Sequence, residues 1–138
     1  MNQPELWLYI AMAMGVASLI LAFVYARQVT SADPGNDRMV ELMGAIREGS
    51  MAFLKREYRA IAIFVALMTV LIMVLLPWGW PWGGVAYVSG ALLSATAGFI
   101  GMRIATAANA RTAEAARRGG TTAALPVAFR GGAVMGFT

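Results

Sequence analysis

Two long stretches without a charged side chain constrain this chain more than any other feature. Residues 6–26 contain no Asp, Glu, Lys or Arg, and as a helix they extend about 31 Å, which matches the hydrocarbon core of a bilayer. The second stretch, residues 60–102, is too long for one crossing and is interrupted at 77–84 by PWGWPWGG. Because Pro and Gly end helices, we expect an antiparallel pair of helices, one over about 60–76 and one from about 85.

The composition supports a membrane protein. Hydrophobic residues make up 59% of the chain and charged residues only 13%, which is too little polar surface for a water-soluble globule. The absence of Cys and His excludes disulfides, thiolate metal sites and a histidine proton shuttle. A net charge of +4 does not predict nucleic-acid binding here, because the basic residues flank apolar spans instead of covering a soluble face.

The first apolar stretch is expected to be a retained span. Its start, MNQPE, carries Glu5 and no basic residue, whereas a secretory signal peptide begins with a basic region and has an apolar part of about 7–15 residues. We therefore expect the helix of residues 6–26 to stay in the mature protein.

The distribution of basic residues predicts the orientation in the membrane. They occur in two groups only, and neither the N-terminus nor the 77–84 turn contains one. Since Lys and Arg collect on the cytoplasmic side, we expect the N-terminus outside and the connections 27–59 and 103–130 in the cytoplasm. The first group is Arg27, Arg38, Arg47, Lys55, Arg56 and Arg59, and the second is Arg103, Arg111, Arg117, Arg118 and Arg130.

The third helix is expected to continue beyond the lipid. Seven alanines and no proline lie between Gly101 and Arg118, so a helix over about 85–118 is favoured until RRGG ends it. A fourth helix begins at about 121, but the residues after Arg130 are too few to complete a crossing. The predicted fold is thus an all-α, multi-pass transmembrane helical bundle with three complete spans and the start of a fourth, and we expect residues 1–138 to be the N-terminal segment of a larger membrane domain.

Small residues recur at every fourth position of the third helix. One ridge runs over 90–98 and another over 97–113, and such ridges allow helices to approach closely. They indicate either packing within one bundle, which we favour, or a dimer interface.

The first basic connection combines a turn at DPGND with an amphipathic stretch over 39–46. We expect this stretch to lie along the membrane surface or against a neighbouring element. Asp33 and Asp37 could bind a hard cation, but the favoured interpretation is turn and helix-capping chemistry, with Asp37 capping the helix that begins at Arg38.

Aromatic and basic clusters have ordinary membrane interpretations. Trp78, Trp80 and Trp82 are typical anchors at the boundary between membrane and water, and this is favoured over a ligand-stacking site. Arg117 and Arg118 could attract an anion, but we interpret them as markers of topology.

Three segments resemble the membrane-bound, ion-translocating inorganic pyrophosphatases. They are GAIREGSMAFLKREYRAIAIF at 44–64, SGALLSATAGFIGMRIATAANARTAEAARRG at 89–119 and ALPVAFRGGAVMG at 124–136. The resemblance implies a homodimer with sixteen spanning helices per subunit, an extracellular N-terminus and pyrophosphate hydrolysis on the cytoplasmic side of the cell (inner) membrane. It also implies Mg²⁺ as cofactor, with K⁺ as a possible second one.

The same resemblance assigns no catalytic, cofactor-binding or metal-binding residue to this chain. Members of the family hold magnesium pyrophosphate with aspartates and lysines of later helices, in a motif resembling DVGADLVGKVE that does not occur here. Phosphoryl transfer to water requires convergent carboxylates, cations and metal ions, and this chain has a single lysine.

The predicted function is therefore that of an outer-helix part of a pyrophosphatase that couples hydrolysis to export of protons or sodium ions. The alternative is a small, non-enzymatic membrane protein that acts as an assembly or interaction partner. A subunit of an ordinary transporter ranks last, because ionisable residues are absent from the interiors of the first three spans.

Overall fold

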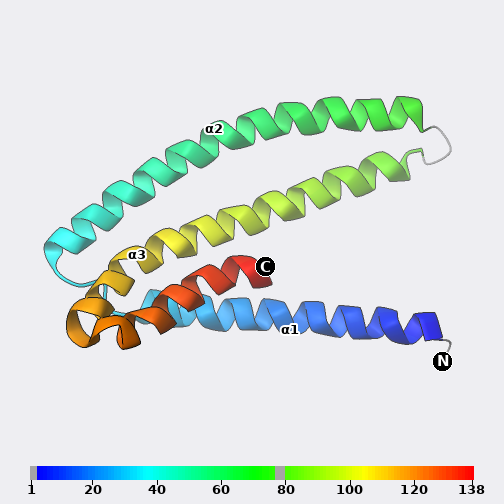
Figure 1. Cartoon of the computed structure of the whole chain (residues 1–138). Coiled ribbons are helices and arrows are strands. Elements are labelled where there is room, and N and C mark those ends of the chain that lie inside the picture. The colour runs from blue at the N-terminus through cyan, green and yellow to red at the C-terminus, as the bar shows by residue number, and fades with distance from the viewer. Residues whose placement is uncertain (1–2, 77–79) are drawn as a thin grey trace. The chain divides into compact units, whose positions relative to one another are not determined.

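The computed structural model describes residues 3–76 and 80–138. Over these residues the chain forms three helices, α1 (Gln3–Ser31), α2 (Asp37–Leu75) and α3 (Trp82–Phe137), and no strand (Figure 1). Each of the three is long and apolar enough to cross a membrane. The predicted all-α, multi-pass class is confirmed.

The turn before α2 is closed by Asn36, so the prediction that Asp37 caps this helix is wrong. The Asn36 side-chain oxygen accepts a hydrogen bond from the Met39 amide at 2.9 Å, and its carbonyl accepts one from the Val40 amide at 3.0 Å. Asp37 is the first residue of the helix, where its charge faces the positive end of the helix dipole. Asn and Asp have similar capping preferences, so the local sequence does not discriminate between neighbouring positions.

The apolar stretch 60–76 lies at the end of a longer helix. The structure starts α2 at Asp37, and the amphipathic stretch 39–46 belongs to the same helix. The intervening residues contain no proline and no adjacent pair of glycines, so nothing in the backbone interrupts the helix. At the following turn, Trp80 and Trp82 are exposed, whereas Trp78 lies outside the described residues.

The backbone of α3 is interrupted at a double glycine. Gly119 has φ −138° and ψ 17°, and Gly120 has φ 65° and ψ −159°, a conformation that only glycine adopts readily. The break divides α3 into a first segment (82–118) and a return segment (121–137).

The chain divides into two compact units, of which one comprises Met1–Arg47 and Ile100–Thr138. In this unit the return segment packs against the first segment of α3. A Cβ added at Gly131 would lie 2.6 Å from the Cβ of Ala108, and one added at Gly101 would lie 2.6 Å from the Cγ of Met135. These two pairs show an antiparallel contact in which glycine removes the obstructing side chain.

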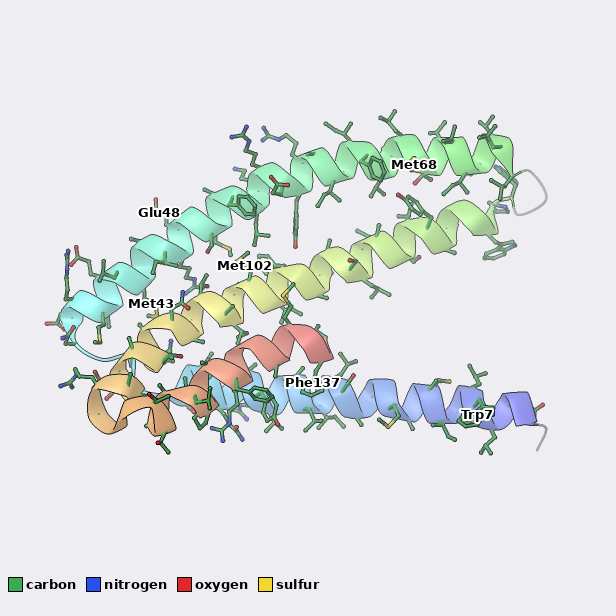
Figure 2. The ribbon with its side chains drawn as sticks, viewed as in Figure 1. Trp7, Met43, Glu48, Met68, Met102 and Phe137 are labelled. Atoms are coloured by element: carbon green, nitrogen blue, oxygen red, sulfur yellow. The ribbon has the colours of Figure 1, made fainter. Side chains whose placement is uncertain are left out.

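The return segment also contacts α1. The rings of Tyr25 and Phe137 lie 6.0 Å apart between their centroids, and Figure 2 shows Phe137 at the end of α3 next to α1. Val29 and Val134, each 1% exposed, are the most buried apolar side chains here. The core of this unit is therefore formed by small and β-branched residues from α1 and both segments of α3.

The other unit is the hairpin Glu48–Phe99, in which the later part of α2 runs beside the start of α3 (Figure 1). The hydroxyl of Tyr58 donates a hydrogen bond to the carbonyl of Ala95 at 2.6 Å. Near the turn, a Cβ added at Gly84 would lie 2.9 Å from the Cγ of Met73. The predicted antiparallel arrangement thus includes a polar contact and a close steric contact between the two helices.

Most of the apolar surface of the spans is uncovered. In the most apolar windows of the three helices, at most 6% of the residues are buried, and large side chains such as Trp7 and Leu67 are about two-thirds exposed. A surface of this kind is compatible with lipid or further helices and not with water.

Candidate functional site

Polar contacts in the first unit gather where α1 ends and the first segment of α3 passes beside it. Arg111 of α3 donates hydrogen bonds from Nε to the carbonyl of Ala32 at 3.0 Å and from Nη2 to the carbonyl of Thr30 at 3.1 Å. Its Nη1 also donates to the carbonyl of Ala107 at 2.8 Å. The last carbonyls of a helix lack hydrogen-bond donors within the helix and carry partial negative charge. Arg111 supplies donors and a positive charge to these carbonyls at the C-terminal end of α1.

The turn after α1 presents Asp33 to α3. The Oδ1 of Asp33 accepts a hydrogen bond from the Gly35 amide at 2.9 Å, which is a typical aspartate turn. Gly35 has φ +93°, and a Cβ added there would lie 3.2 Å from the Oε2 of Glu114 and closer still to the sulfur of Met39. Glycine is therefore required at this position by both the backbone angle and the close approach of Glu114.

A charged cluster, formed by Asp33, Glu114, Arg117 and Arg118, joins this turn to α3. Glu114 is 1% exposed and accepts hydrogen bonds from Nε and Nη2 of Arg117 at 2.7 and 2.8 Å. Arg118 donates from Nε to Glu114 and from Nη2 to Asp33. One buried carboxylate thus receives two guanidinium groups, and one of these groups bridges to the α1–α2 turn.

The electrostatics of the cluster keep both carboxylates ionised. The hydrogen bond from Arg117 is the largest influence on Glu114, and together with Arg118 it lowers the pKa of Glu114 from 4.5 to about 2 in spite of burial. The pKa of Asp33 is lowered chiefly by the hydrogen bond from the Gly35 amide. Hydrogen bonding to Glu114 raises the pKa of both Arg117 and Arg118. At neutral pH, therefore, neither carboxylate takes up a proton.

The charged cluster acts as a structural clamp, which means that its ion pairs hold the α1–α2 turn against the first segment of α3. The oxygens of Glu114 are occupied by guanidinium groups, so they are not available to a metal ion or a substrate proton. Within residues 3–76 and 80–138, no three carboxylates gather into a possible metal site. The alternative that Asp33 and Asp37 bind a metal ion is not supported by these contacts, because the Asp33 carboxylate accepts hydrogen bonds from Arg118 and from the Gly35 amide.

The sequence interpretation named Arg117 and Arg118 as markers of topology and overlooked their partner. Glu114 precedes them by three and four residues, and this spacing places opposite charges on one helix face. The pattern could have predicted the intrahelical pairs. It could not have predicted the burial of Glu114 or the contact with Asp33, which lies 85 residues away.

Comparison with known proteins decides the family. The sequence model of the family described as inorganic H+ pyrophosphatase matches residues 16–138. The chain belongs to the inorganic H+ pyrophosphatase family. The resemblance of segments 44–64, 89–119 and 124–136 is thereby confirmed.

Several relatives of this chain carry functional names. It is 45% identical over 132 residues to the K(+)-insensitive pyrophosphate-energized proton pump of Methanosarcina mazei, covering 96% of this chain and 19% of the relative. It is 41% identical, over the same shares of both chains, to the putative K(+)-stimulated pyrophosphate-energized sodium pump of Clostridium tetani. A K(+)-stimulated pyrophosphate-energized sodium pump of Thermotoga maritima is 44% identical over 75% of this chain and 14% of its own length. The chain thus spans about a fifth of the pumps that it matches, or less.

Proposed function

We propose that this chain forms the N-terminal, outer-helix part of a membrane pyrophosphatase that hydrolyses inorganic pyrophosphate and exports protons or sodium ions. The observation that carries the proposal is the family match over residues 16–138, together with relatives whose names specify pyrophosphate-energized pumps. The helical structure, with three helices able to cross a membrane, fits such a role.

Within that protein we assign the chain a scaffold role. The charged cluster ties the α1–α2 turn to the first segment of α3, and Arg111 ties the end of α1 to the same segment. The return segment adds the close contacts at Gly101 and Gly131. Together these contacts hold the emergent part of α3 at a defined position, where it can support the cytoplasmic part of a catalytic core.

The described residues do not themselves fit a magnesium site. Mg²⁺ prefers carboxylate and water oxygens in octahedral geometry, whereas the buried carboxylate Glu114 is held by two arginines. We therefore place no step of the reaction on this chain. Mg²⁺, pyrophosphate, the transported cation and any K⁺ would bind residues outside it.

The proposed setting is the cell (inner) membrane, with the N-terminus outside, connections 27–59 and 103–130 in the cytoplasm, and a homodimeric assembly. The positive-inside rule supports this orientation, since all eleven basic residues fall in those two connections. The chain has no native cysteine, so single cysteines at Ser31 and Ser89 allow a direct test. We expect a membrane-impermeant maleimide to label S31C only in inverted vesicles, and S89C, within α3, serves as the unlabelled control. Labelling of S31C in right-side-out vesicles would reverse the orientation.

The scaffold role predicts a specific loss when the buried carboxylate is neutralised. The test compares Glu114→Gln with the matched control Glu41→Gln in the pump that contains this segment. Glu41 pairs with Arg38 at 2.7 Å, but both side chains are about two-thirds exposed, and such surface pairs contribute little. We expect E114Q to lower the temperature at which pyrophosphate-driven ion uptake is lost, and E41Q to leave it unchanged.

Three results would contradict the proposal at different levels. If E114Q retains the heat stability and ion uptake of the wild type, the clamp is not needed for the scaffold. If the wild-type protein carries out no pyrophosphate-dependent ion uptake in sealed vesicles, the pump function itself is refuted. A variant that lacks residues 1–120 and keeps full activity would likewise exclude the scaffold role.

A further inference from the structure

The hairpin Glu48–Phe99 contains an open groove between α2 and α3. Its volume is about 490 Å³. Four alanines, Ala62, Ala66, Ala91 and Ala95, line it from the two helices, and their short side chains leave the space that larger residues would fill. This volume lies within the range of about 300–1,000 Å³ that is typical of small-molecule binding sites.

The groove offers nothing polar to a ligand. The Tyr58 hydroxyl at one end donates to the carbonyl of Ala95 at 2.6 Å, and the Thr69 hydroxyl donates to the carbonyl of Val65 in its own helix at 2.7 Å. The remaining lining side chains are aliphatic. Because the groove lies along a membrane-spanning stretch, its natural occupant is a hydrocarbon chain.

Positive charge lies at the Tyr58 end of this groove. Lys55 and Arg59 continue, at helical spacings of three and four, the row of Ala62 and Ala66 that lines the groove. Both cations are exposed, and neither side chain forms an ion pair within residues 3–76 and 80–138. Arg56 falls on the opposite face of α2, and Glu57 flanks the other edge of the groove.

We propose that this hairpin binds an anionic phospholipid, with one acyl chain in the groove and the phosphate beside Lys55 and Arg59. Basic residues at the level of the headgroups attract anionic lipids, and a long cationic side chain at the end of a span extends toward the interface. The apolar groove and the cations that continue one of its edges therefore match the two parts of a single lipid. The site is independent of pyrophosphate hydrolysis.

The test measures lipid retention on the purified full-length protein by native mass spectrometry. The protein is equilibrated with equal amounts of dioleoyl phosphatidylglycerol and dioleoyl phosphatidylcholine, which share their acyl chains and differ in headgroup charge. We expect the wild type to retain phosphatidylglycerol preferentially. K55Q/R59Q should lower this preference about fivefold for each cation removed, whereas R56Q, with the same charge change on the other face, should keep it.

Two further variants distinguish the contribution of the groove to lipid binding from the contribution of the charge. Glu57→Gln removes a repelling carboxylate and should raise the preference for phosphatidylglycerol. Ala66→Leu fills the groove and should lower the retention of both lipids.

Three results would overturn the proposal. The first is a wild type without headgroup preference, and the second is a loss in R56Q as large as that in K55Q/R59Q. The third is unchanged retention in A66L, which would mean that protein, and not lipid, covers the groove. The wild-type measurement alone decides the first point even if a variant fails to fold.

Discussion

Adjacent glycines in the return segment of α3 provide the sharpest test of its packing. Gly131 and Gly132 lie in the same helix, one residue apart. A Cβ at Gly131 would lie 2.6 Å from the Cβ of Ala108, whereas a Cβ at Gly132 would meet nothing within 4 Å. The substitutions Gly131→Ala and Gly132→Ala therefore make the same chemical change in two different environments.

The magnitude follows from two opposing effects. Each substitution gains about 1 kcal/mol of helix propensity, because alanine loses less backbone entropy than glycine. At Gly131 the new methyl group must move about 1 Å to reach an ordinary carbon–carbon distance of ~3.6 Å, and overpacking of this kind costs roughly 1–3 kcal/mol. Since the propensity gain is common to both variants, we expect G131A to be less stable than G132A by about 1–3 kcal/mol.

The assay is reversible unfolding of the detergent-solubilised chain by added dodecyl sulfate, followed by circular dichroism at 222 nm. The second mutation Ala108→Gly removes the methyl group that G131A would strike. In an A108G background, G131A should therefore lose its penalty, and the double-mutant cycle should return the same 1–3 kcal/mol as a coupling energy.

Equal stabilities for G131A and G132A would refute the reasoning. Such a result would mean that the return segment does not approach the first segment at Ala108. A coupling energy near zero, combined with a destabilised G131A, would instead place the obstruction at a residue other than Ala108.

Three further outcomes are expected. Gly120→Ala should destabilise the chain by about 1–3 kcal/mol in the same unfolding assay, because φ 65° with ψ −159° strains any residue with a Cβ, whereas Gly136→Ala, with nothing within 4 Å, should not destabilise it. The pKa of Glu114 is about 2 in the folded chain against an ordinary 4.5, so the contribution of Glu114 to the free energy of unfolding should be constant above about pH 5 and fall between about pH 4.5 and 2. E114Q should show a shallower fall over this range. Identical pH profiles of stability for the wild type and E114Q would exclude the clamp. Tyr58→Phe removes the hydrogen bond to α3 and should cost about 0.5–1.5 kcal/mol, whereas Thr69→Val, which removes only a bond within α2, should cost less.

Short-range patterns in the sequence were sufficient to predict the helical class and the family. The first charge-free stretch matches the thickness of a bilayer, the second is divided by PWGWPWGG into two parts, and the helices that contain them are observed. The motifs of 44–64, 89–119 and 124–136 are contiguous in the chain, so the resemblance could be read without a structure. Such features depend on residues that are neighbours along one helix or one segment.

The sequence alone was less informative about the turn before α2 and about the charged cluster. Asn36 and Asp37 have nearly equal capping preferences, and the hydrogen bond from the Met39 amide to the Asn36 side chain identifies the cap only in the structure. Similarly, Arg117 and Arg118 resemble ordinary topology markers until the α1–α2 turn brings Asp33 to them.

The division between the two kinds of information has a physical basis. Helix formation, span length and charge asymmetry depend on interactions within about one turn of helix or on partition between water and lipid, and both can be read from residue order. The burial of Glu114, the close approach at Gly131 and the groove beside Ala62 depend on which segments of the chain meet. Gly131 and Gly132 are of the same residue type and lie in the same helix. Only the tertiary structure places Gly131 against Ala108, so that glycine is needed there, and leaves space for a side chain at Gly132.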